Sequence, residues 1–140
     1  MRNILFYRFK NNDRGVAAIE FALVTPVLIL LVLGIIEFGW LFNGWVTITS
    51  AAREGARIAT VKDGDPELET FVVNAVKNHA YPTFSKEKVN ASYIIGEPEK
   101  IKGTEYESVQ VTATGDLEPL VRFFVSDTVR LTGEATMRLY

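Results

Sequence analysis

Two glutamates interrupt an otherwise uncharged apolar segment near the start of this chain. From Val16 to Trp45, Glu20 and Glu37 are the only charged residues. A charged side chain at membrane depth costs about 2.5–3.5 kcal/mol on insertion scales, so an isolated glutamate there requires a partner. The chemistry that these two residues predict is therefore charge pairing within or beside a membrane.

A glycine separates this apolar segment from a basic start. Residues 1–15 carry four Lys and Arg residues against one aspartate, a net charge of +3. Hydrolysis of the Gly15–Val16 bond would remove this basic leader and keep the apolar segment. Glycine suits such a site, because a backbone without a side chain can lie extended and close to a protease. The new amine on Val16 would lie about one helical turn from Glu20.

The residues around this glycine resemble those of a known family. GVAAIEF, residues 15–21, is similar to the prepilin-peptidase site of type IV pilins. The longer string GVAAIEFALVTPVLILLVLGIIEFGWLF, followed by AAREGAR, resembles the TadE-like pseudopilins of the tight-adherence (Tad) pilus system. The resemblance covers about residues 14–60, where glycine, glutamate, proline, a second glutamate and an Ala/Gly/Arg extension follow in order.

The resemblance implies a minor pilin, or pseudopilin, that a prepilin peptidase cleaves after Gly15. The mature chain would then assemble through its N-terminal helix into a Tad pilus or its initiating complex, and would support adhesion and biofilm formation. The implied assembly residues are Val16, Glu20 and Phe21, with N-methylation of the new terminus. The implied partners are the peptidase, other pilins and pseudopilins of the Tad system, and an inner-membrane assembly platform. The alternative for Glu20 is a carboxylate that merely lies among lipid headgroups.

Residues 16–61 are expected to form one long helix. Its first thirty residues would reach roughly 45 Å, more than the ~30 Å of membrane hydrocarbon. We therefore expect it to span the membrane to about residue 45 and to extend outside to about residue 61. Pro26 removes one amide donor within the segment and predicts a kink. Glu37 is expected at the outer headgroup level, beside an interfacial belt of tryptophans.

The basic leader predicts the orientation of this anchor. By the positive-inside rule, the N-terminus is cytoplasmic and the C-terminal domain is extracytoplasmic. The expected location is the inner membrane, as a single-pass protein in contact with membrane lipid, and then the pilus at the cell surface. An alternative from another class is an uncleaved single-pass anchor that carries a binding or scaffold domain in the periplasm.

Small residues recur along the outer part of the expected helix. Such a stripe lets another element approach closely. Its partner is either the protein's own C-terminal domain or a neighbouring subunit, and the sequence leaves both open. The stripe consists of Ala51, Ala52, Gly55, Ala56 and Ala59.

Residues 62–140 predict a small α+β domain. Apolar residues at helical spacing indicate a helix over residues 66–80, which ends before Pro82. Alternation of apolar and polar residues then indicates three antiparallel strands with one face exposed to solvent. A charged loop is expected over residues 96–105, and the pair Phe123–Phe124 lies in the next connection, where core packing is favoured over docking. The fold class is thus a long transmembrane helix followed by one helix packed on a three-stranded sheet.

The sequence shows no recognisable group of catalytic or metal-binding residues. The chain has no cysteine and one histidine, and its acids show no metal-ligand spacing. We therefore expect no catalytic residue, no metal and no cofactor. Because the whole chain carries −2 and residues 1–15 carry +3, residues 16–140 carry −5, which disfavours nucleic acid as a partner.

Overall fold

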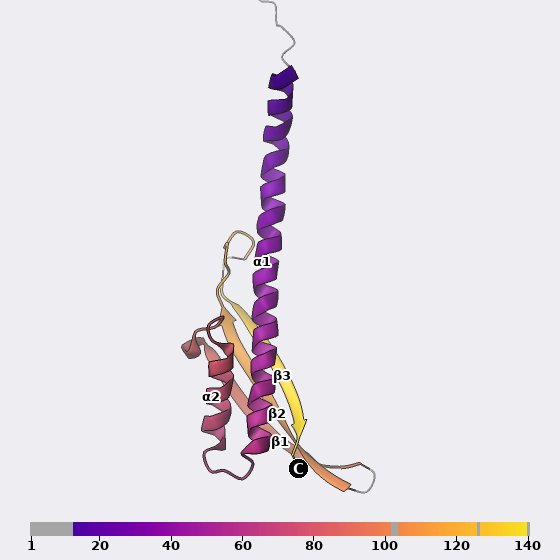
Figure 1. Cartoon of the computed structure of the whole chain (residues 1–140), viewed down its shortest axis with the longest axis vertical. Helices are drawn as coiled ribbons and strands as arrows, with labels where there is room; N and C mark the ends of the chain where they lie inside the picture. Colours follow the sequence, from indigo (N-terminus) through magenta and orange to yellow (C-terminus); the bar gives the residue numbers. More distant parts are fainter. Residues whose placement is uncertain (1–12, 102–103, 126, 140) are drawn as a thin grey trace, which may run out of the picture. The chain divides into compact units, whose positions relative to one another are not determined.

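The structure is a computed structural model that describes residues 13–101, 104–125 and 127–139. The chain divides into two compact units, residues 1–36 and residues 37–140. Along the described residues, two helices are followed by a short 3-10 helix and three strands (Figure 1). The predicted α+β class, with a long N-terminal helix, a second helix and a three-stranded sheet, is confirmed.

Helix α1 spans Asp13–Val61 and belongs to both units. It starts three residues before the predicted Val16 and ends at the predicted Val61. The helix continues through Asn43, Gly44 and the β-branched residues that follow, all of which have weak helix propensity. Tertiary packing explains this continuity, because Ile48 in the same stretch is fully buried in the domain core.

The first unit contributes the apolar part of α1. None of residues 16–36 is buried, although almost all of them are apolar. Among the residues that the structure describes, α1 is long and apolar enough to cross a membrane by length and composition. This segment supports the single-pass anchor that the sequence predicts.

Helix α2 spans Leu68–Ala80 and begins after a turn. The Asp65 carboxylate accepts a hydrogen bond from the backbone N–H of Glu67 at 2.9 Å, which stabilises the chain just ahead of the first turn. The helix therefore starts two residues later than predicted and stops before Pro82 as expected. Its buried residues recur every four positions and form one apolar face: Leu68, Val72, Val76 and Ala80.

The sheet consists of β1 (Val89–Ile101), β2 (Thr104–Leu117) and β3 (Val129–Arg138), in the antiparallel order β1-β2-β3. The predicted charged loop over residues 96–105 is wrong for most of its length, because β1 and β2 continue their pairing through it with a register shift between Gly96 and Glu99. Charged residues are compatible with strand pairing where a hairpin extends past the core into solvent. Residues 102 and 103 lie outside the described part.

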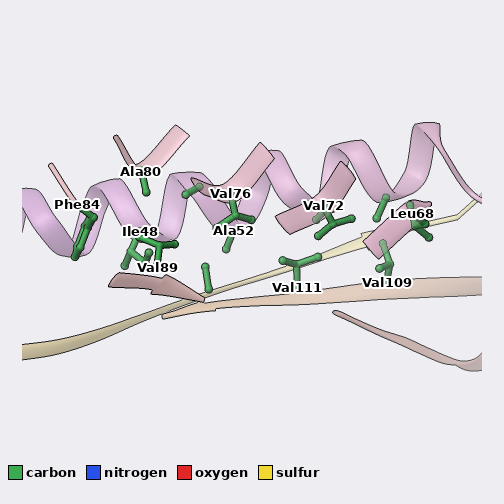
Figure 2. Close-up of a cluster of buried hydrophobic side chains, with 14 of the residues drawn as sticks. Ile48, Ala52, Leu68, Val72, Val76, Ala80, Phe84, Val89, Val109 and Val111 are labelled. Atoms are coloured by element: carbon green, nitrogen blue, oxygen red, sulfur yellow. The ribbon is translucent and has the colours of Figure 1, made fainter. Parts of the chain in front are cut away.

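The core lies between one face of the sheet and the two helices. On β2, the buried residues alternate as Val109, Val111 and Ala113, which turns one face toward the helices. Figure 2 shows Val72 and Val76 of α2 in one cluster with Val111 and with Ile48 and Ala52 of α1. The second half of α1 is therefore an integral element of this small domain.

Candidate functional site

The predicted cleavage bond lies at the start of α1. Because the helix begins at Asp13, Gly15 and Val16 lie in its first turn and have helical backbone, not the extended backbone that the sequence suggests. Val16 is exposed. The predicted leader, residues 1–15, otherwise lies outside the described residues, since residues 1–12 are not among them.

Glu20 lies one turn beyond this bond. It is exposed and follows Val16 by four residues, so both side chains belong to the same side of the helix. Within the part of the chain that the structure describes, Glu20 forms no hydrogen bond or ion pair with another side chain. Phe21, the third predicted assembly residue, is also exposed. A positive group on residue 16 would therefore meet an accessible carboxylate.

Two adjacent residues alter the hydrogen bonding of the next turn. Pro26 lies inside α1, where its ring nitrogen cannot donate to the carbonyl of Ala22. The neighbouring Thr25 hydroxyl donates to the carbonyl of Phe21 at 2.6 Å, a side-chain bond that often accompanies helix bending. Both features lie within the exposed apolar segment, and the helix remains continuous through them.

Glu37 is buried within the protein, an environment that the sequence does not reveal. Its side chain is only 2% exposed, and both carboxylate oxygens accept hydrogen bonds. The backbone N–H of Leu120 donates at 3.2 Å and that of Val121 at 2.7 Å. Glu37 therefore fixes the β2–β3 loop, residues 118–128, to the first turn of the compact domain. Its position at the level of the outer headgroups stays a prediction.

Trp40 contributes a second link to the same loop. Its indole N–H donates to the carbonyl of Glu118 at 2.9 Å, and its ring packs against the core. Trp40 therefore links the loop to α1 and packs within the domain. Trp45 remains half exposed and contacts the ring of Phe42, with centroids 5.9 Å apart.

The small-residue stripe packs against the protein's own domain. All five of its members are buried in this single chain. A Cβ added to Gly55 would lie 2.7 Å from Val76 Cγ2 and 3.1 Å from Val111 Cγ1, so glycine is needed where α1, α2 and β2 meet. Of the two partners that the sequence leaves open, the structure selects the C-terminal domain over a neighbouring subunit.

Ion pairs hold the two ends of the β2–β3 loop. Lys88 and Arg122 both contact Glu118, and the Lys88 ammonium is the main reason why the pKa of Glu118 lies below its usual value. Arg130 pairs with Asp116 at 2.8 Å and lowers the pKa of that carboxyl. These groups are exposed, so we assign them a modest role in loop position.

The acidic side chains and a surface cavity are the remaining candidates for a chemical site among the described residues. They contain no group of three or more His, Asp or Glu side chains that would hold a metal ion. A surface cavity of about 400 Å³ is lined by Lys88, Asp116, Thr128 and Arg130. Three of these residues already form the ion pairs at the ends of the loop, so the cavity offers no unpaired charge to a substrate.

Sequence reasoning missed the link between Glu37 and the β2–β3 loop. The partners are 83 and 84 residues apart in the chain, and main-chain donors leave no pattern in a sequence. The available signal was the carboxylate itself, since a lone acid at the end of an apolar run requires a partner.

The N-terminal part of the chain matches a known family. The family model described as TadE-like protein matches residues 15–57, a range that starts at the predicted cleavage glycine and ends within the small-residue stripe. No curated protein and no solved structure matches the chain. Over residues 15–57, a little under a third of the chain, this protein is therefore similar to the TadE-like family.

Proposed function

We propose that this protein is a minor pilin, or pseudopilin, of a Tad pilus. The observation that carries the proposal is the TadE-like match over residues 15–57, which begins at Gly15 and contains the exposed apolar segment with its single acid, Glu20. The proposed role is structural and involves no cofactor and no catalytic step by this chain. Its partners are a prepilin peptidase, other pilins and pseudopilins, and an inner-membrane assembly platform.

The first step is cleavage between Gly15 and Val16. In the precursor this bond lies in the first turn of α1, where the amide N–H groups have no partner inside the helix. A terminal turn frays readily, so the peptidase can bind it in extended form. Glycine at position 15 favours this unwinding, because it is a poor helix former.

The second step is pairing of the new Val16 amine with Glu20. The exposed Glu20 carboxylate is within one turn of residue 16, so it can pair in the same chain or with the amine of the next subunit. In either arrangement the pair neutralises two charges that would otherwise be isolated among apolar side chains. Pairing between subunits would also fix their axial register.

The third step is assembly through residues 16–36. These 21 residues rise about 32 Å as a helix, close to the ~30 Å of membrane hydrocarbon. Because the compact domain begins at Glu37, we place the membrane exit there and not near residue 45. The small-residue stripe is buried in the protein's own domain, so the surface left for helix bundling in a filament is the exposed segment 16–36.

The basic leader supports an N-terminus in the cytoplasm and a domain outside it. We propose that the protein waits in the inner membrane as a single-pass protein. After processing it would join the pilus or its initiating complex and contribute to adhesion and biofilm formation.

Replacing Glu20 tests the assembly step. We expect Glu20→Ala to be cleaved after Gly15 as usual but to lower the amount recovered in sheared pili at least about tenfold, the effect of losing ~1.4 kcal/mol per subunit contact. The measurements are the N-terminal sequence of the membrane-bound protein and an immunoblot of the sheared fraction. Glu54→Ala is the control, because Glu54 is a surface acid of the same helix that pairs only with Arg57 among the described residues. Normal pilus incorporation of Glu20→Ala would contradict the proposed pairing.

A further inference from the structure

The β2–β3 loop exposes a cluster of large apolar side chains. Leu120 is 59% exposed, Phe123 is 63% exposed and Phe124 is 53% exposed. The two phenyl rings contact each other edge to face, with centroids 5.2 Å apart. The sequence favoured core packing for this pair, and the structure corrects that expectation. A contiguous cluster of large apolar side chains on a protein surface usually marks a site that contacts another molecule or a membrane.

The backbone of this loop is firmly attached to α1. Glu37 accepts hydrogen bonds from two consecutive backbone N–H groups, and Trp40 donates to a third residue of the loop. Arg122 adopts a φ of 52°, which turns the chain sharply between Val121 and Phe123. The backbone that directly precedes the two exposed rings is therefore held to α1.

Glu37, the residue that holds the loop, lies directly after the apolar run of α1. Glu37 directly follows Ile36, the last residue of the segment that we place in the membrane hydrocarbon. The backbone of the loop is within hydrogen-bond distance of the residue that follows the proposed membrane exit. Continuity of the chain thus indicates what covers the loop, namely the lipid surface beside that exit.

The side chains of the loop suit such a surface. Aromatic and aliphatic residues next to a basic residue are typical of segments that insert at the boundary between headgroups and acyl chains. Arg122 lies between the apolar residues of the loop, and its side chain is 64% exposed. Exposed Phe42 and Trp45 lie within about 12 Å of Glu37 along the helix axis. Both are of the type found at membrane interfaces.

We infer that the β2–β3 loop is a second membrane contact, in which Leu120, Phe123 and Phe124 insert into the outer interface of the bilayer beside the exit of α1. This inference rests on the proposed membrane insertion of residues 16–36. The contact would hold the domain against the membrane before assembly. Extraction into a filament would then require the loop to leave the lipid.

Site-specific labelling of the full chain tests this contact. Because the chain contains no cysteine, a single engineered cysteine can carry an environment-sensitive NBD fluorophore. We would label Phe124→Cys and reconstitute the full chain, without peptidase, in vesicles of phosphatidylcholine and phosphatidylglycerol. Doxyl-labelled phosphatidylcholine in the same vesicles would quench any fluorophore that lies in the lipid. Ile94→Cys is the matched control, because Ile94 is an exposed apolar residue on β1, 66% exposed. Leu28→Cys lies in the apolar part of α1, so its label reports whether that helix is inserted in the bilayer.

The expected result is blue-shifted emission and doxyl quenching at positions 124 and 28, with neither effect at position 94. Quenching at position 28 together with water-like emission at position 124 would overturn the loop contact, while still supporting membrane insertion of residues 16–36. Absence of quenching at position 28 would overturn both. Blue-shifted emission at position 124 that grows with protein density and resists doxyl quenching would assign the loop to a second copy of the chain, and would also overturn a lipid contact.

Discussion

Replacing Gly133 with alanine is expected to destabilise the domain by about 3 kcal/mol, at the upper end of the usual range for overpacking. Gly133 lies on β3, opposite Ala113 of β2. A Cβ at this position would lie 2.6 Å from both the Cα and the N of Thr49, and 2.8 Å from the carbonyl carbon of Ile48. These are main-chain atoms of α1, so no side-chain rotation relieves the clash. The helix or the strand must shift as a whole.

Two other glycines provide the controls for this experiment. The methyl group of Gly55→Ala would meet side-chain methyl groups of Val76 and Val111 and no main-chain atom, so we expect a smaller loss than for Gly133→Ala. Gly39→Ala meets nothing within 4 Å and should stabilise the helix by up to about 1 kcal/mol. The measurement is urea denaturation of the full chain in detergent micelles, followed by near-UV circular dichroism. Equal stabilities for Gly133→Ala and the wild type would contradict the close contact between α1 and β3.

Removing the Glu37 side chain is expected to release the β2–β3 loop from α1. In Glu37→Ala the N–H groups of Leu120 and Val121 lose both acceptors, and hydrogen bonds to charged groups contribute about 1.5–3 kcal/mol each. We expect a loss of about 3 kcal/mol. Glu37→Gln keeps one acceptor oxygen, so its loss should be about half as large.

Hydrogen exchange locates this effect. The amides of Leu120 and Val121 should exchange about a hundredfold faster in Glu37→Ala, since each 1.4 kcal/mol is a factor of ten. Glu54→Gln is the matched control, because this surface acid of α1 pairs with Arg57 and does not contact the loop. Unchanged exchange at both amides in Glu37→Ala would show that the carboxylate does not hold the loop.

Local patterns predicted the elements of this fold well. The four-residue spacing of Leu68, Val72 and Val76 and the alternation of Val109 and Val111 both depend on near neighbours in the chain. The hairpin between β1 and β2 extends farther than predicted, because its charged residues resemble a loop in composition. Whether charges lie in a loop or on a solvated hairpin depends on pairing across the sheet, which composition does not record.

Long-range partners were the part that the sequence did not determine. The stripe around Gly55 has the same small residues whether it meets its own sheet or another subunit, and only the fold decides between them. Glu20 and Glu37 are both single acids in an apolar run, yet Glu37 is buried against backbone donors and Glu20 is exposed. Their difference arises from where the compact domain begins.

Processing at Gly15 is the central claim, and intact mass with N-terminal sequencing tests it most directly. We would recover the full-length protein from membranes of cells with and without a prepilin peptidase, together with Gly15→Leu and, as a control, Gly39→Leu. The predicted result is a chain that starts at Val16 only when the peptidase is present, that is lost in Gly15→Leu and retained in Gly39→Leu. A chain that still starts at Met1 in the presence of the peptidase would contradict the claim and identify an uncleaved single-pass anchor.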